Sequence, residues 1–166
     1  MAAATEVRDA LRDEDYEALA AMVSPDENVV FAPHANFVDE STRLSPQEVR
    51  RLGTSSTVYS WTDRFGDPFE MDFADYRDYH VWDRDFDDAP YVTVDDYHTS
   101  GDADLDPGWW PNVAEYFGST AHWVEYCFPA QGEGEAGTAL YLVFRETATG
   151  YYLIGINHNE WVVGAG

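Results

Sequence analysis

Two histidines in the C-terminal third of the chain each have a glutamate close by in the sequence. His122 lies three residues before Glu125, and His158 lies two residues before Glu160. A histidine beside a carboxylate is a plausible acid–base pair, because imidazole titrates near neutral pH and the carboxylate can orient the ring. The alternative is a structural histidine that hydrogen-bonds a neighbouring strand or loop. We favour this alternative for His158.

The alternation of apolar residues places His158 on the last of three expected strands. If a hairpin turn at residues 147–150 pairs Glu146 with Tyr151, then Ala139 lies opposite His158. Glu160 follows His158 on the same face, where the mouth of a cavity is expected. In this register, four residues share one face: Tyr141, Ile154, Ile156 and His158.

Other reactive side chains do not form a recognisable motif. The five histidines include no His-Glu-x-x-His pair. Cys127 alternates with aromatic residues in a strand and is expected to be a small core residue. The acidic runs 83–88 and 102–106 lack the glycine and glutamate that a calcium loop requires, and we interpret them as solvated loops. We therefore expect no metal and no cofactor.

Aromatic residues are abundant enough to line a ligand pocket as well as to fill a core. The chain has 6 Trp, 11 Tyr and 9 Phe among its 166 residues. Most must pack in the interior, because aromatic side chains bury large areas. Tyr59 and Trp61, on an expected strand, are our ligand-binding candidates among them.

The balance of charge is strongly acidic. There are 32 Asp and Glu against nine bases, all of them arginine, for a formal net charge of −23. At low ionic strength such a surface repels itself, whereas at molar salt the Debye length falls to about 3 Å and the repulsion is screened. The composition therefore predicts a protein adapted to high salt, similar to those of halophiles that accumulate salt. An acidic mimic of nucleic acid is a weaker alternative, because the acids are spread along the whole chain.

The same composition bears on partners and location. Nucleic acid is not an expected partner, because the chain has no basic patch. No apolar run approaches the roughly 18 residues of a membrane span, so no membrane association is expected. The first residues show neither a signal peptide nor a lipidated cysteine, and we expect a cytoplasmic protein.

Helical patterns come first in the chain and strands last. Residues 5–23 are periodic like a helix with an acidic break, and Ser45, Pro46 and Glu48 carry the signature of a capping box. Residues 122–128, 138–146 and 151–163 alternate like consecutive antiparallel strands. These patterns predict one α+β domain over residues 1–166, in which N-terminal helices pack on a curved antiparallel sheet that encloses a cone-shaped cavity.

Seven segments occur in a distinctive order and spacing: residues 29–33, 44–48, 58–61, 66–69, 79–86, 123–129 and 153–161. Together they resemble a group of small bacterial proteins, many of them exported or lipid-anchored, that looks like a branch of the NTF2-like (cystatin-related) fold. The resemblance spans about residues 6 to 163 and implies the same α+β fold, but no activity. We expect the chain to depart from that group in location, because its first residues do not resemble an export signal.

Three functions remain open. We expect a non-catalytic module that binds an unknown small molecule or protein, because aromatic residues are plentiful and catalytic motifs are missing. Pairing of two copies through the sheet would fit such a module. The first alternative is a cofactor-free NTF2-like enzyme of the cyclase or isomerase type that uses His158 with Glu125 or Glu160. The second alternative is the nucleic-acid mimic.

Overall fold

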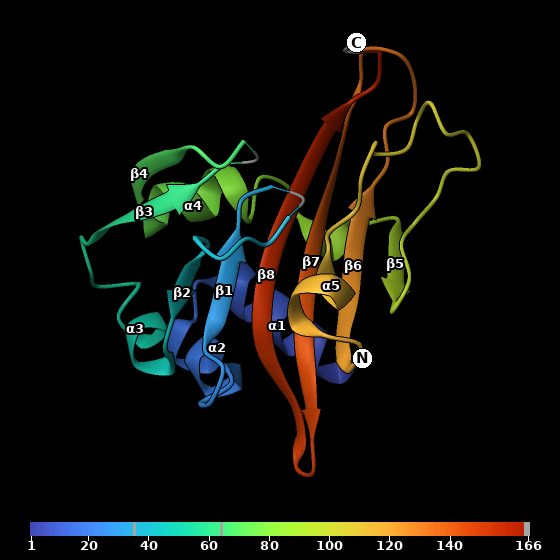
Figure 1. Ribbon diagram of the computed structural model, residues 1–166. Helices are drawn as coiled ribbons and strands as arrows, with labels where there is room; N and C mark the ends of the chain where they lie inside the picture. Colours follow the sequence, from blue (N-terminus) through green and yellow to red (C-terminus); the bar gives the residue numbers. More distant parts are fainter. Residues whose placement is uncertain (35, 64, 165–166) are drawn as a thin grey trace.

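A six-stranded sheet forms the centre of the molecule in the computed structural model, which describes residues 1–34, 36–63 and 65–164. The strand order is β2-β1-β8-β7-β6-β5, and the sheet is not closed on itself (Figure 1). β7 and β8 are the longest strands and bend along their length (Figure 1). The strands are β1 (Val29–Ala32), β2 (Thr42–Leu44), β5 (Tyr91–Val94), β6 (Ala121–Phe128), β7 (Ala136–Thr147) and β8 (Gly150–Val162).

The sheet is mixed, so the predicted antiparallel sheet is only part of it. β6, β7 and β8 form the predicted antiparallel run, with Glu146 opposite Tyr151 at the hairpin. β1, however, runs parallel to β8, with Val30 opposite Gly155. This pairing joins segments more than 100 residues apart, so no local turn signal in the sequence could reveal it.

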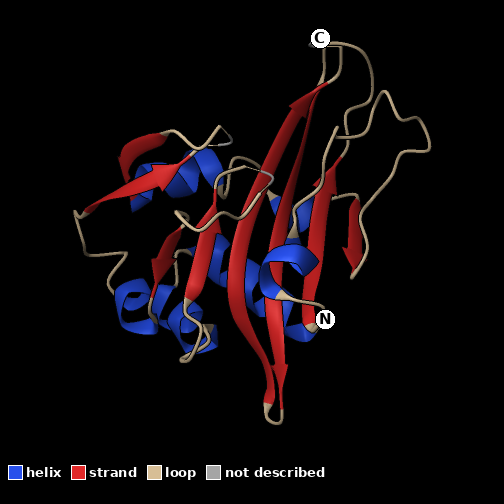
Figure 2. Ribbon diagram, viewed as in Figure 1, coloured by secondary structure: helices blue, strands red, loops and turns tan. Residues whose placement is uncertain are grey.

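Two N-terminal helices, α1 (Ala2–Asp13) and α2 (Tyr16–Met22), pack on one face of this sheet (Figure 2). They occupy the predicted helical segment 5–23, which Glu14, in a left-handed conformation, divides at its acidic break. As the acidic break suggested, Asp15 begins the second helix, and its side chain accepts a hydrogen bond from the backbone N–H of Ala18 at 3.0 Å. No helix in the described ranges is both long and apolar enough to cross a membrane.

A second layer of short elements extends this helical face. It comprises a two-stranded sheet, β3 (Val58–Thr62) with β4 (Pro68–Asp72), the helices α3 (Pro46–Arg50) and α4 (Phe73–His80), and a turn of 3₁₀ helix, η1 (Phe86–Asp88). Ser45 and Glu48 form the predicted capping box of α3. Buried aromatic side chains fill the space where a cone-shaped cavity was expected, because Trp61, Phe73 and Tyr76 from these elements pack against Phe31 of β1.

Loops and the short helix α5 (Val113–Phe117) cover the opposite face of the sheet. Phe37 stacks on Tyr116 there and packs edge-on against Phe117. Tyr97 stacks on Trp123 nearer to β5. Both faces of the sheet are therefore covered.

A β-bulge in the β7–β8 pair decides which residues of β8 face the helices. Val143 pairs with Gly155 and Phe144 with Leu153, so Ile154 is the extra residue. One extra residue reverses the faces of all that follow it. The predicted register is therefore wrong beyond the bulge.

The register shift also changes which residues share a face with His158. Leu140, not Ala139, lies opposite His158. Of the predicted stripe, Ile156 and His158 face the helices, whereas Tyr141 and Ile154 face α5 and the loops.

Candidate functional site

His158 lies near the end of β8, on the helical face of the sheet, and only 2% of it is exposed. Its Nε2 is 3.0 Å from Oδ1 of Asp83 and 3.0 Å from Oγ1 of Thr138. Its Nδ1 is buried and has no hydrogen-bond partner among the described residues. With a carboxylate at Nε2, the neutral ring carries its proton there, and Nδ1 presents a lone pair.

Asp83 is the carboxylate that the sequence analysis missed. It lies three residues after the end of α4 and two after the buried Val81, and its side chain is 25% exposed. Burial raises the pKa of Asp83, but the hydrogen bonds from His158 and Thr138 and the charges of His158 and Arg84 together outweigh this effect, and the net pKa is lowered. Asp83 lies in the exposed acidic turn, as predicted, but it also has a specific partner, which that interpretation did not include. No local pattern separates it from the other acids of 83–88, because its partner lies 75 residues away on β8.

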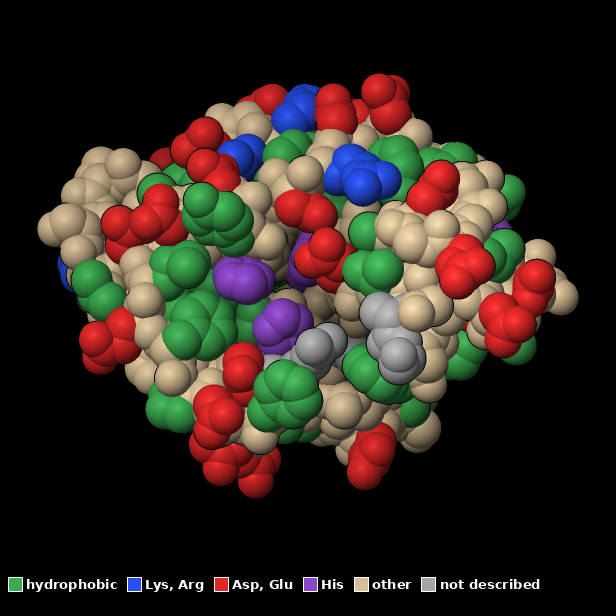
Figure 3. All heavy atoms as spheres, turned by 90° about the horizontal axis from the view of Figure 1, so that it is seen from above, with side chains coloured by type: hydrophobic (Ala, Val, Ile, Leu, Met, Phe, Trp, Pro, Cys, Tyr) green, Lys and Arg blue, Asp and Glu red, His purple; other side chains and the backbone are tan. Residues whose placement is uncertain are grey.

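Two further histidines lie beside this pair. The rings of His34 and His80 meet edge-on, with centroids 5.8 Å apart. The pKa of His80 is lowered to about 4, mainly by burial and also by the charges of His34 and His158. Figure 3 views the molecule from above relative to Figure 1. It shows histidine side chains around a hollow in the surface, with acidic side chains next to them. We name His34, His80, His158 and Asp83 the histidine cluster.

A pocket of about 700 Å³ opens beside the histidine cluster, at the end of β8. Its wall includes His34 from the cluster, and Asn159 and Glu160, which follow His158 in the chain. Trp109 and Trp161 add aromatic surface. Trp161 is fixed by a 3.0 Å hydrogen bond from Nε1 to the carbonyl of Leu105. We name this cavity the C-terminal pocket.

The predicted partners of His158 divide between the two faces of the sheet. Glu160 shares the face of His158, is exposed and lines the C-terminal pocket. Glu125 pairs with Tyr141 on the opposite face, so it cannot be the carboxylate that holds His158. The structure thus brings His158 together with Asp83 rather than with the predicted glutamates.

Glu125 forms a separate buried network. It is only 1% exposed and accepts hydrogen bonds from the Tyr141 hydroxyl at 2.8 Å, the Thr93 hydroxyl at 2.9 Å and the backbone N–H of His98. Burial raises its pKa, although these three donors act in the opposite direction. Since both carboxylate oxygens have partners, the network ties β5 and the segment after it to the sheet.

The remaining candidates lie elsewhere. His122 Nδ1 is 2.8 Å from Asp95 Oδ2 in a half-exposed pair on β6, far along the sheet from His158. Trp61 is fully buried, stacks on Tyr76 and donates from Nε1 to the Met71 carbonyl at 2.9 Å. Tyr59 is half-buried beside it. These positions make Trp61 part of the core rather than of a pocket wall.

The structure also describes the one cysteine and the possible metal ligands of the chain. Cys127 is buried, and burial raises the pKa of its thiol, which keeps it protonated and unreactive. Within residues 1–34, 36–63 and 65–164, no group of three His, Cys, Asp or Glu side chains is placed to hold a metal ion. The chain matches no protein-family model, no curated protein and no solved structure.

Proposed function

We propose that the protein binds a small molecule in the C-terminal pocket and that His158 accepts a hydrogen bond from it. The observation that carries this proposal is the buried Nδ1 of His158, which has no partner among the described residues while Asp83 holds Nε2. Buried polar groups in folded proteins are almost always paired, so an unpaired one needs a ligand or a water molecule. A hydroxyl or amide group of a ligand would supply the missing donor.

Access to His158 requires movement of a neighbour. Its Nδ1 has almost no exposed surface, whereas the His80 ring beside it is only half-buried. His80 contacts His34, and His34 lines the C-terminal pocket. We propose that rotation of the His80 ring connects the pocket with His158.

We also propose that the fold is NTF2-like. N-terminal helices on one face of a bent sheet agree with the resemblance seen in the sequence. The interior between helices and sheet is filled by aromatic side chains, so the ligand site of this chain lies at the end of the sheet. Fold alone does not assign a function, which therefore rests on the histidine cluster.

A ligand screen with matched variants tests the binding proposal. Small hydroxyl- and amide-bearing compounds are added to wild-type protein, and the melting temperature is recorded. We expect compounds that stabilise the wild type and His122→Gln but have at least tenfold lower affinity for His158→Phe, because one hydrogen bond to a buried acceptor is lost. Equal binding to His158→Phe would place the ligand elsewhere.

A cofactor-free proton-transfer enzyme is the second candidate. The 3.0 Å contact between His158 and Asp83 favours it, because a carboxylate on one ring nitrogen leaves the other free to act as a base. The test uses a carbonyl-bearing compound from the screen, dissolved in D₂O. Enzyme-dependent exchange of its α-protons, absent in His158→Phe, would support catalysis, and bound compound without exchange would leave a binding protein.

A further inference from the structure

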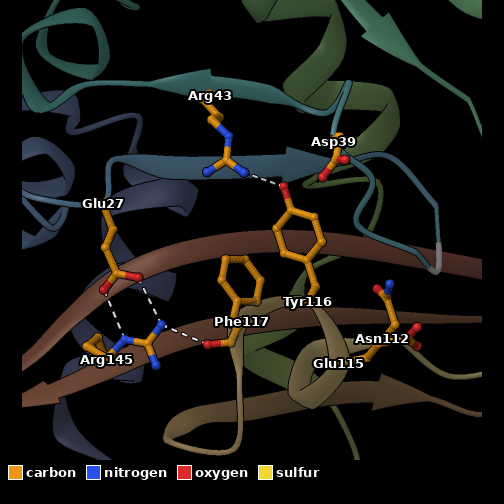
Figure 4. A pocket seen from close by; sticks show the side chains of 8 residues that line it. All are labelled: Glu27, Asp39, Arg43, Asn112, Glu115, Tyr116, Phe117 and Arg145. Atoms are coloured by element: carbon orange, nitrogen blue, oxygen red, sulfur yellow. Dashed lines mark hydrogen bonds and ion pairs between the residues drawn. The ribbon is translucent and has the colours of Figure 1, made fainter.

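A second pocket lies on the other face of the sheet, between α5 and the strands β1 and β2. Figure 4 shows Arg43 and Arg145 entering it from opposite sides, with the ring of Phe117 between them. Its volume is about 440 Å³, and it shares no lining residue with the C-terminal pocket. We name it the arginine pocket.

Arg145 is fully engaged by the protein. It forms two hydrogen bonds to the carboxylate of Glu27, at 2.9 and 2.8 Å, and two more to Thr120 Oγ1 and the Phe117 carbonyl. The hydrogen bond from Arg145 lowers the pKa of Glu27, despite partial burial of the carboxylate, and keeps it ionised. The positive charge of Arg145 and the negative charge of Glu27 therefore neutralise each other in the wall of the arginine pocket.

Arg43 is different, because no carboxylate pairs with it among the described residues. Its guanidinium contacts the hydroxyl of Tyr116 and lies 5.6 Å from the centre of that ring. Both contacts are neutral. Arg51 and Arg84 likewise form no ion pair among the described residues, but only Arg43 of these three lines the arginine pocket. Five other arginines do pair with carboxylates: Arg8, Arg12, Arg50, Arg77 and Arg145.

We propose that the arginine pocket binds a small monocarboxylate. Its carboxylate would pair with Arg43, whose planar guanidinium matches the two carboxylate oxygens. Its apolar part would lie against the half-buried ring of Phe117. Asp39 and Glu115 line the same pocket, so they would repel a ligand with more negative charge, such as a phosphate dianion, more strongly than a monocarboxylate.

Benzoate is the probe that combines one carboxylate with a planar apolar group. Titration is followed by NMR amide shifts in about 1 M KCl, where the Debye length is about 3 Å and the general field of the acidic surface is screened. We expect saturable shifts at Tyr116 and Phe117, no saturable shifts with benzamide or inorganic phosphate, and at least tenfold weaker benzoate binding by Arg43→Gln. Arg51→Gln, an exposed arginine outside the pocket, is the matched control and should bind like the wild type.

Three results would overturn the proposal. Benzamide that binds as tightly as benzoate would show that the carboxylate is not recognised. Benzoate that binds Arg43→Gln with unchanged affinity would remove Arg43 from the site. A lack of saturable shifts with benzoate, in wild-type protein whose spectrum shows that it is folded, would rule out the monocarboxylate. His158→Phe should bind benzoate normally, which separates this site from the C-terminal pocket.

Discussion

The two nitrogens of His158 have opposite environments, and the contrast defines its role. Nε2 has both Asp83 and Thr138 within 3.0 Å, whereas Nδ1 has no partner in the described part of the chain. A purely structural histidine would satisfy both nitrogens, and a general base in an open cleft would be exposed. His158 meets neither description, which is why we place its function in ligand binding behind a movable ring.

The hydrogen bond of Asp83 should contribute to stability near neutral pH. Asp83→Asn removes the charged acceptor of His158, and we expect the free energy of unfolding at pH 7 to fall by about 1–2 kcal/mol. Because the folded-state pKa of Asp83 lies below its ordinary value of 3.8, this stability is present above about pH 4 and is lost as the pH falls further. Urea unfolding at pH 7 and pH 3 checks both effects.

Asp88→Asn serves as the control for Asp83→Asn. Asp88 is exposed and lies in the same acidic run, so its substitution should change the free energy of unfolding by no more than about 0.5 kcal/mol. If both variants lost the same stability at pH 7, the contact between Asp83 and His158 would contribute nothing specific.

His80 should make stability depend on pH in a different range. Its pKa is about 4 in the folded protein and near 6.5 in the unfolded chain, so between these values the unfolded chain binds more protons. Stability therefore falls as the pH is lowered from 6.5 to 4. His80→Gln should flatten this slope, measured as melting temperature against pH, whereas Tyr79→Gln on the exposed side of α4 should keep it.

Prediction of the candidate site from sequence was limited by distance along the chain. His158 could be identified because it ends an apolar stripe on a predictable strand. Asp83 could not be identified as its partner, since only the packing of α4 against the sheet brings the two together. The buried network of Glu125 was equally hidden, because its donors come from three separate segments.

At the scale of elements, local signals were the reliable ones. The cap at Asp15, the capping box at Ser45 and the hairpin at residues 147–150 depend on neighbours in sequence, and all three are present. The parallel pairing of β1 with β8 depends on a distant partner, and the sequence analysis did not find it. It also missed the short strands β2 and β4, although each pairs with the preceding strand in the chain. Gly155 adjoins the bulge at Ile154, and a glycine inside a strand often marks a bulge. The sequence analysis extended the register from the hairpin without using this signal.

The end of the β7–β8 pair leaves no room for a larger residue at position 137. A Cβ atom on Gly137 would overlap the indole ring of Trp161, which lines the C-terminal pocket. Gly137→Ala should lower the free energy of unfolding by about 1–3 kcal/mol through overpacking, and it should weaken any ligand of that pocket. Gly132→Ala, where a Cβ meets open space, should have little effect. Equal melting temperatures of the two variants would contradict this packing argument.

At the scale of the whole molecule, acidic charge is the dominant property. Figure 3 shows acidic side chains scattered over the surface at the end of the histidine cluster, with few arginines between them. Five arginines form ion pairs with carboxylates, yet the formal net charge is still −23. Most of the carboxylates must therefore be balanced by ions from the solvent, as the proposed adaptation to high salt requires.

We expect the melting temperature to rise steeply with KCl between about 0.1 and 1 M, over which the Debye length falls from about 10 to 3 Å. The reason is that self-repulsion destabilises the compact state more than the expanded one. Differential scanning calorimetry at a series of KCl concentrations measures it. Sucrose, which stabilises folded proteins without screening charge, should not substitute for the salt at low ionic strength. A melting temperature that stays flat or falls with KCl would refute the proposed adaptation.

The extra residue at Ile154 has a consequence for comparing this chain with homologues. A relative without the bulge would need a one-residue gap at this position in a sequence alignment. Without the gap, each residue from 155 to 162 would be matched to one that points to the opposite side of its sheet. His158 would then be aligned with a residue on the opposite face of the sheet. The alignment would hide the histidine cluster even in a homologue that has it.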